Sequence, residues 1–360
     1  MDAKKTAIYD SHVKLGGNIV EYAGWALPSD FTGLVDEHNA VRNDVGIFDV
    51  SHMGEFFITG PDTLKFCNYV LSNDVNKVDN GQCQYTILLN EEGGVVDDLL
   101  LFKYSDEKVL WVPNGGNTPK DFDWIQARKD GFDVELENAS AKYSEVALQG
   151  PKSKELLQKV VDYNLDELEY FHFVDDVDFD GKKVLISRTG YTGELGYEIY
   201  CAWDDGPAIW DKLVELGAKP CGLGCRDTLR FEASMPLYGN EMDEDKSPLE
   251  AGLKFAIDFN KDDFIGKAPL QKKLDEGLKR KLIGLELTGK GIPRHGYKVL
   301  KDGKEIGEVT TGYLAPTVGK PIANVIIDVD EAVIGNEVEV QIRKRTVPAV
   351  IISKRFLQKK

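Results

Sequence analysis

The chain changes character at Lys279 and Arg280, and this change limits the folds open to it. From there onward the sequence consists of short apolar runs rich in β-branched residues, separated by turns such as the one at residues 301–303. Runs of this kind are typical of strands in a small all-β domain. At 360 residues, the chain also exceeds the size at which one hydrophobic core usually stops growing. We therefore expect two or three domains, the last of them all-β.

The residues before 279 mix helices with strands. A strand, a Gly-Pro pair and a helix follow one another at residues 55–71 and again at 146–161. Residues 84–90 and 95–104 are apolar runs joined by a turn with two glycines, which predicts a β-hairpin, and residues 108–114 predict a third strand. The predicted fold class is α+β.

The charge balance excludes several kinds of partner. Acidic residues outnumber basic ones by 61 to 44, which gives a net charge of -17. Phosphate binding needs clustered Lys and Arg, so we expect neither nucleic acid nor an anionic membrane surface as a partner. The sequence has no run of about 18 apolar residues, and residues 1–17 lack the apolar stretch of a signal peptide. We therefore expect a cytoplasmic protein.

The five cysteines are odd in number and scattered along the chain, which favours a reducing compartment over a disulfide framework. Cys221 and Cys225 form a C-x3-C pair, but no second Cys or His pair follows at metal-binding spacing. We therefore expect no metal site.

Two adjacent aspartates, Asp97 and Asp98, interrupt an apolar strand just after the two glycines of the predicted hairpin. Neighbouring residues on a strand point to opposite faces, so one of the two must face a core or a cavity. A carboxylate in such a place needs partners to offset its desolvation. It is therefore either held by structural hydrogen bonds or a ligand-facing acid or base.

The segment 188–198 contains three glycines but matches neither a phosphate-binding loop nor a dinucleotide fingerprint. Its aromatic and acidic residues suit a flat polar heterocycle, with Tyr191 to stack on the ring and Glu198 to accept from ring N–H groups. A tight hairpin with a packed tyrosine is the alternative. Arg226 is expected in the first turn of a helix, where it opposes the helix dipole. It would pair with a carboxylate or a heterocycle carbonyl, or belong to a buried ion pair.

His52 lies beside Ser51, but the chain has no G-x-S-x-G elbow, so the structural interpretation of this histidine is favoured. Met53 next to it is polarisable and suits an aromatic ligand, although filling a core is the commoner role.

Taken in chain order, ten segments resemble the glycine cleavage T-protein family, and together they span nearly the whole sequence. The segments are YAGW (22–25), DEHNAVR, FDVSHMGE, QYTILLNEEGGVVDDL, ALQGP, SRTGYTGELGYE, PCGLGCRDTLRFEASMPLYGNEMDE, SPLEAGL, DFIGK and GIPRHGY.

The resemblance implies a reaction: an aminomethyl group on the lipoyl arm of H-protein passes to tetrahydrofolate. It also implies a fold of three domains in a cloverleaf around a folate channel. The expected domains are residues 1–50 with 142–270, residues 51–141, and a small β-barrel at 279–360. Tetrahydrofolate is the implied co-substrate, and lipoylated H-protein is the implied partner.

By the same resemblance, Asp98 matches the aspartate that orients the folate and raises the nucleophilicity of N5. Glu198 and Arg226 match residues that hold the pterin ring. Residues matched to the lining of the pocket are Met53, Tyr85, Asn114 and Tyr191.

Two other functions stay open from the sequence. The same pocket would serve a folate-dependent demethylase that acts on a free methylated small molecule, or a non-catalytic folate-binding protein. Intact FDVSHMGE and GIPRHGY favour the T-protein reaction, and retention of Asp98, Glu198 and Arg226 argues against the non-catalytic protein. The segment 112–121 departs from the family pattern at Gly115, Gly116 and Pro119.

Overall fold

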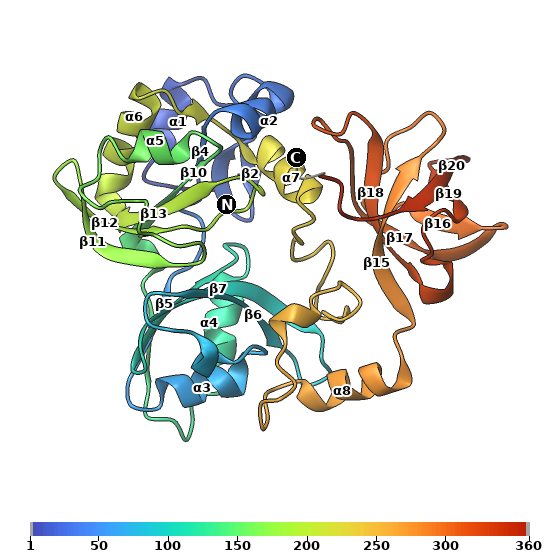
Figure 1. Ribbon diagram of the computed structural model, residues 1–360, viewed down its shortest axis with the longest axis horizontal. Coiled ribbons are helices and arrows are strands. Elements are labelled where there is room, and N and C mark those ends of the chain that lie inside the picture. The colour runs from blue at the N-terminus through green and yellow to red at the C-terminus, as the bar shows by residue number, and fades with distance from the viewer. Residues whose placement is uncertain (1–2, 358–360) are drawn as a thin grey trace. The chain divides into compact units, whose positions relative to one another are not determined.

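The computed structural model describes residues 3–357, which contain eight α-helices and four β-sheets. Internal contacts divide the chain into two units, which are described separately (Figure 1). The first unit comprises Met1–Val70, Asp74–Thr86 and Leu99–Leu229, and the second comprises Leu71–Asn73, Ile87–Asp98 and Arg230–Lys360. None of the described helices is both long enough and apolar enough to span a membrane.

A six-stranded sheet organises the first unit, in the order β11-β12-β13-β10-β4-β14. All neighbouring strands are antiparallel except β14, which is parallel to β4. The strands are β4 (Gly46–Asp49), β10 (Tyr143–Gln149), β11 (Phe173–Phe179), β12 (Lys182–Ser187), β13 (Gly196–Ala202) and β14 (Lys219–Pro220).

One face of this sheet forms the main core of the first unit. Alternate strand residues such as Ile47, Val146 and Ile199 pack there against Trp210 and Leu157. The helices on this side are α1 (Tyr9–Lys14), α5 (Ser153–Leu157) and α6 (Gly206–Glu215), as Figure 1 shows. Because side chains alternate along a strand, the residues in between face the other way.

That opposite face carries one of the candidate residues, Glu198. Phe48 and Ala147 pack there against Cys225 and Leu229 of α7 (Leu223–Glu232), with Val41 of α2 (Leu34–Asn43) beside them. Glu198 shares this face, because it stands opposite Ala147 in the strand register. The sheet thus buries an apolar core on one side and presents acidic side chains on the other.

A five-stranded sheet has the order β6-β7-β8-β5-β9 and carries the predicted hairpin. Its strands are β5 (Phe56–Thr59), β6 (Cys83–Leu89), β7 (Val95–Ser105), β8 (Lys108–Pro113) and β9 (Glu135–Asn138). The hairpin and third strand predicted from the sequence are therefore confirmed to within a residue. The helices α3 (Thr63–Val70) and α4 (Thr118–Gln126) follow β5 and β8 in the chain. A small sheet joins β1 (Lys4–Lys5), β3 (Trp25–Pro28) and β2 (Ile19–Tyr22).

The two strand–Gly-Pro–helix copies share a backbone conformation. Gly60 and Gly150 both have φ near +128°, a region that favours glycine. A Cβ at either position would lie 2.5 or 2.4 Å from a backbone carbonyl oxygen, that of Asp133 or Asp44 respectively. Each glycine is therefore required by the same close backbone approach.

The second unit contains the predicted barrel. Its strands close in the order β15-β18-β17-β16-β19-β20 around a core of Val, Ile, Leu and Ala side chains. They are β15 (Arg280–Leu287), β16 (Lys298–Lys301), β17 (Lys304–Leu314), β18 (Pro321–Asp328), β19 (Glu337–Ile342) and β20 (Arg345–Ile352), preceded by α8 (Lys267–Glu276). The α+β class and the C-terminal barrel are thus confirmed. The division into three domains at the stated boundaries stays a prediction.

The hairpin turn depends on Gly94. A Cβ there would lie 1.7 Å from the backbone oxygen of Glu244, while the Gly94 N–H donates to Asn90 Oδ1 at 2.7 Å. Because the clash is with backbone, we expect Gly94→Ala to lower the free energy of unfolding by about 3 kcal/mol. Denaturant unfolding followed by circular dichroism measures the effect, and an unchanged midpoint would contradict this packing.

A buried ion pair lies in the second unit. Arg230 Nη1 and Glu241 Oε2 are 3.0 Å apart, and both side chains are fully buried. The other Glu241 oxygen accepts from the hydroxyls of Thr310 and Thr311, each at 2.7 Å.

Removing one partner of such a pair leaves an uncompensated buried charge. We therefore expect Glu241→Ala to cost about 3–5 kcal/mol of unfolding free energy. The exposed pair of Lys272 and Glu276 offers a matched control, in which Glu276→Ala should cost less than about 1 kcal/mol. Thermal and denaturant unfolding compare the two variants, and equal losses would refute the assignment.

Candidate active site

Three candidate residues from separate elements come together in the first unit. Arg226 lies in the first turn of α7, and its Cζ is 4.9 Å from the ring centroid of Tyr191, in the loop between β12 and β13. This is a cation–π contact. Glu198 in β13 lies near Arg226: burial raises the pKa of the Glu198 carboxyl, and the guanidinium opposes that rise. An aromatic face, a cation and an acid are thus brought into one site.

Glu198 is buried but supplied with donors. Its Oε2 accepts from the Thr189 hydroxyl at 2.5 Å, and Thr189 is in turn 2.5 Å from the Ser187 hydroxyl. Burial raises the pKa of the Glu198 carboxyl, while Thr189 and Arg226 oppose that rise. The arrangement stabilises a negative charge on Glu198 better than burial alone would allow.

Two glycines of the Tyr191 loop make room for a side chain of the protein. A Cβ on Gly190 or Gly196 would lie 2.1 or 2.3 Å from the side chain of Gln149. Gln149 donates to the Thr189 carbonyl at 3.2 Å and accepts from the Thr192 hydroxyl at 2.9 Å. The loop is therefore held in place by the glutamine of the ALQGP segment, and this fixes where Tyr191 lies.

Two further acids near this site were missed from the sequence. Glu145 of β10 stands opposite Tyr200 of β13, and its carboxyl is buried. Glu55, just before β5, is also buried. Burial, then the Glu198 and Glu55 carboxyls, raises the pKa of Glu145 well above its usual range. An acid within a strand, as at Glu145, and an acid directly before an apolar strand, as at Glu55, were the signals that could have pointed to them.

His52 and Met53 lie in the turn between β4 and β5. Burial, then the positive charge of Arg226, lowers the pKa of His52 to about 4, so this imidazole is neutral at pH 7. Both residues line a cavity of about 860 Å³. Gly115, one of the departures from the family pattern, packs against this turn, because a Cβ there would lie 2.2 Å from the His52 carbonyl oxygen.

The remaining candidate residues lie in the strands of the five-stranded sheet or directly after one of them. Tyr85 in β6 and Asn114 after β8 are half-buried residues of the first unit. In β7 the two aspartates alternate as expected, with Asp97 fully buried and Asp98 partly exposed. Asp98 belongs to the second unit, so its role beside the folate stays a prediction.

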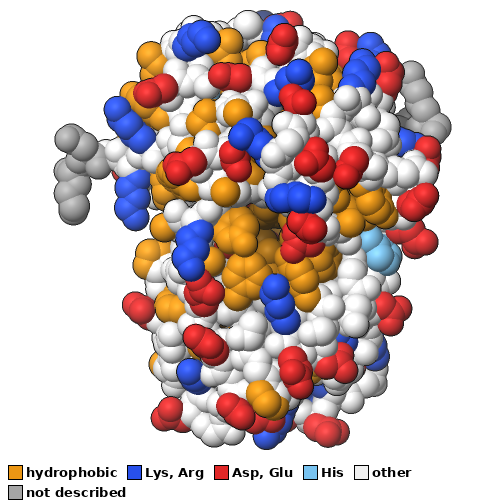
Figure 2. All heavy atoms as spheres, turned by 90° about the vertical axis from the view of Figure 1, so that its left-hand side faces the viewer, with side chains coloured by type: hydrophobic (Ala, Val, Ile, Leu, Met, Phe, Trp, Pro, Cys, Tyr) orange, Lys and Arg blue, Asp and Glu red, His pale blue; other side chains and the backbone are white. Residues whose placement is uncertain are grey.

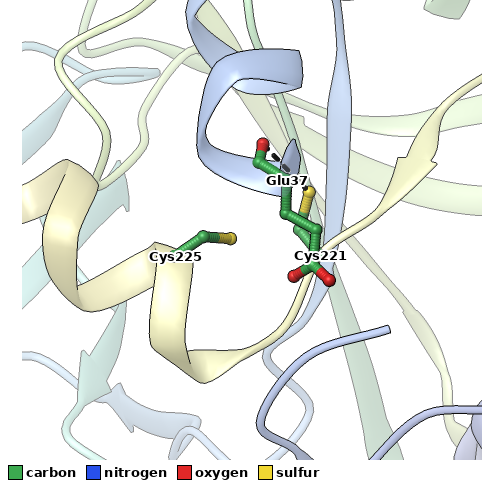
Figure 3. Close-up of side chains that lie close together, drawn as sticks. All are labelled: Glu37, Cys221 and Cys225. Atoms are coloured by element: carbon green, nitrogen blue, oxygen red, sulfur yellow. Dashed lines mark hydrogen bonds between the residues drawn. The ribbon is translucent and has the colours of Figure 1, made fainter. Parts of the chain in front are cut away.

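Three buried side chains have atoms of the kind that can bind a metal ion within 4.8 Å of one another. They are Glu37, Cys221 and Cys225 (Figure 3). The Glu37 carboxylate accepts from the backbone N–H groups of Phe31, Thr32, Gly33 and Gly222. The two thiols donate to backbone carbonyls, including that of Glu37. These interactions explain the cluster as a structural link between α2, β14 and α7.

Figure 2 shows a face of the molecule on which hydrophobic side chains gather in a hollow with charged groups around it. The first unit has a pocket of about 290 Å³ with Tyr104, Leu110, Tyr143, Leu185 and Tyr200 in its lining. Lys142, Lys183, Asp175 and Asp176 also line this pocket. Tyr200 thus stands opposite Glu145 in the strand register and also lines this pocket.

The fold and this site together have clear counterparts among known proteins. Residues 8–261 match the GCVT N-terminal domain, and residues 280–358 match the glycine cleavage T-protein C-terminal barrel domain. An aminomethyltransferase of Caldanaerobacter subterraneus subsp. tengcongensis is 49% identical over 360 residues, covering 99% of this chain and 96% of the relative. An aminomethyltransferase of Lysinibacillus sphaericus is 48% identical, covering 99% of both chains.

A solved structure agrees with these sequences. The glycine cleavage system aminomethyltransferase T from Bartonella henselae superposes with a TM-score of 0.92 at 31% identity, covering 98% of each chain. The chain belongs to the glycine cleavage T-protein family. The family resemblance predicted from the sequence is therefore confirmed, together with the prediction that the chain is an enzyme of the aminomethyltransferase class.

Proposed function

We propose that this protein transfers the aminomethyl carbon from the lipoyl arm of H-protein to tetrahydrofolate. The products are 5,10-methylenetetrahydrofolate, ammonia and dihydrolipoyl H-protein. In this reaction N5 and N10 of the folate each form a bond to the carbon, and the C–N and C–S bonds break. The two folate N–H protons end on ammonia and on the lipoyl sulfur, so no oxidant or metal is required.

The observation that carries this proposal is the grouping of buried Glu198 with half-buried Tyr191 and Arg226. A pterin ring offers a flat aromatic face, N–H donors and a carbonyl acceptor. Glu198 can accept from the donors, and Tyr191 can cover the face. Within the described residues Arg226 Nη1 is buried without a hydrogen-bond partner, so this nitrogen can donate to the carbonyl.

In this proposal the protein acts mainly by placing the reactants. Holding N5 against the aminomethyl carbon can lower the activation barrier by about 7–11 kcal/mol. Asp98 would orient the folate and raise the nucleophilicity of N5. Met53, Tyr85 and Asn114 would line the pocket around the bound ring.

The donor distinguishes this function from a folate-dependent demethylase. We expect turnover with aminomethylated H-protein, and none with free dimethylglycine, sarcosine or a methylated sulfonium compound. Each donor is supplied with tetrahydrofolate, and the folate product is measured by chromatography. Turnover with a free methylated donor, and none with H-protein, would reverse the assignment.

A further inference from the structure

Three buried acids of the first unit form a cluster in which Glu145 interacts with both other carboxyls, and the cation Arg226 acts on two of the three. Glu55, Glu145 and Glu198 are only 1%, 2% and 6% exposed. The Arg226 guanidinium acts on the carboxyls of both Glu145 and Glu198. Three buried negative charges against one positive charge would carry a large desolvation penalty. The cluster must therefore hold fewer charges than it has carboxyl groups.

The hydrogen bonds indicate which acid carries the charge. Glu198 accepts a short bond from Thr189, and a hydrogen bond to the charged form favours ionisation. For Oε2 of Glu145 and both carboxyl oxygens of Glu55, by contrast, the described residues supply no hydrogen-bond donor. Glu198 is thus the acid best suited to be ionised, while Glu145 and Glu55 are best suited to be neutral.

The strand register places Glu145 next to the folate-binding group. In the β10–β13 pair, Glu145 stands opposite Tyr200, and Ala147 stands opposite Glu198. Glu145 and Glu198 are therefore diagonal neighbours on one face, about 7–8 Å apart along the pleat. Glu145 is close enough to compete for Arg226 without being part of the proposed pterin contacts.

We propose that Glu145 is a positioning residue, which as an uncharged carboxylic acid leaves the Arg226 guanidinium to Glu198 and the folate. The inference rests on the proposed function, because it takes the folate as the ligand of Arg226. If Glu145 became ionised, it would attract the guanidinium toward β10. Arg226 would then be less available to an acceptor on the bound ring.

This arrangement predicts a pH dependence of folate binding. Burial, then the carboxyls of Glu198 and Glu55, raises the pKa of Glu145, while Arg226 and Tyr200 oppose the rise. These four are the groups that act on Glu145, from β13, from the segment before β5 and from α7. Because the neutral form is the binding form, affinity for tetrahydrofolate should fall as pH rises through the Glu145 pKa.

Three forms of the intact chain test the proposal. Tetrahydrofolate is the probe, and its Kd is measured by anaerobic calorimetry from neutral to alkaline pH. Glu145→Leu removes the ionisable group, and we expect its Kd at neutral pH to stay within about threefold of wild type. Glu145→Gln keeps a neutral hydrogen-bonding group, and we expect the same of it. Both variants should abolish the loss of affinity that wild type is expected to show as pH rises.

Glu215 on α6 is exposed, so Glu215→Gln is the matched control for removing one negative charge, and it should retain the wild-type pH profile. The proposal is overturned if Glu145→Gln or folded Glu145→Leu keeps the wild-type loss of affinity as pH rises. It is also overturned if either variant, although folded, binds tetrahydrofolate more than tenfold more weakly than wild type at neutral pH. Failure of wild type itself to bind tetrahydrofolate would instead refute the proposed function.

Discussion

Asp98→Asn is expected to lower the rate of aminomethyl transfer by about 10²–10³-fold while the protein stays folded. General acid–base and orienting groups contribute about 10²–10⁴-fold to enzymatic rates, and asparagine keeps the shape of the side chain but loses its charge. Asp98 is partly exposed in β7, so its replacement should disturb packing little. Single-turnover transfer and thermal unfolding are measured on the same preparation.

Asp97 provides the matched control for this variant. It precedes Asp98 in the same strand but is fully buried, because the two side chains point to opposite faces. Asp97→Asn is therefore expected to lower stability more than the transfer rate per folded molecule. Full transfer activity in Asp98→Asn, or the opposite pattern in the two variants, would show that the catalytic role is wrongly assigned.

The second large effect is expected at Arg226. Hydrogen bonds to charged groups contribute about 1.5–3 kcal/mol, so Arg226→Ala should raise the Kd for tetrahydrofolate about 10- to 150-fold. The substitution also removes a positive charge that lowers the pKa of Glu198. More of Glu198 is then protonated at a given pH, so the remaining affinity should recover as pH rises and Glu198 ionises.

Arg226→Lys is the control that keeps the positive charge but not the shape of the guanidinium group. Lysine restores a positive charge but cannot reproduce the planar fork of a guanidinium, so an intermediate Kd is expected. Binding by Arg226→Ala that equals wild type would mean that the ring lies elsewhere.

Several features of the fold could be predicted from the sequence because they depend on local pattern. The hairpin of β6 and β7 follows from two apolar runs around a glycine turn, and the barrel from its run of short strands. Tyr191 and Arg226 could be nominated because their residue types suit a flat heterocycle. Their cation–π contact shows that two segments far apart in sequence do meet.

Other features depend on tertiary contacts that no local pattern contains. The glycines of segment 188–198 matched no known loop, and two of them, Gly190 and Gly196, make room for the side chain of Gln149. The C-x3-C pair gave no hint of Glu37, whose carbonyl accepts from Cys221 across 184 positions of sequence. Glu145 was not nominated from the sequence, because only the strand register shows that it shares a face with Glu198.

The most direct test of the account is a single-turnover experiment with aminomethylated H-protein that carries ¹³C in the aminomethyl carbon. The account predicts that the label appears in 5,10-methylenetetrahydrofolate, with one ammonia released per labelled carbon. It also predicts that this happens only when tetrahydrofolate, the H-protein and this protein are all present. Label that stays on the H-protein, although the protein binds tetrahydrofolate, would contradict the account.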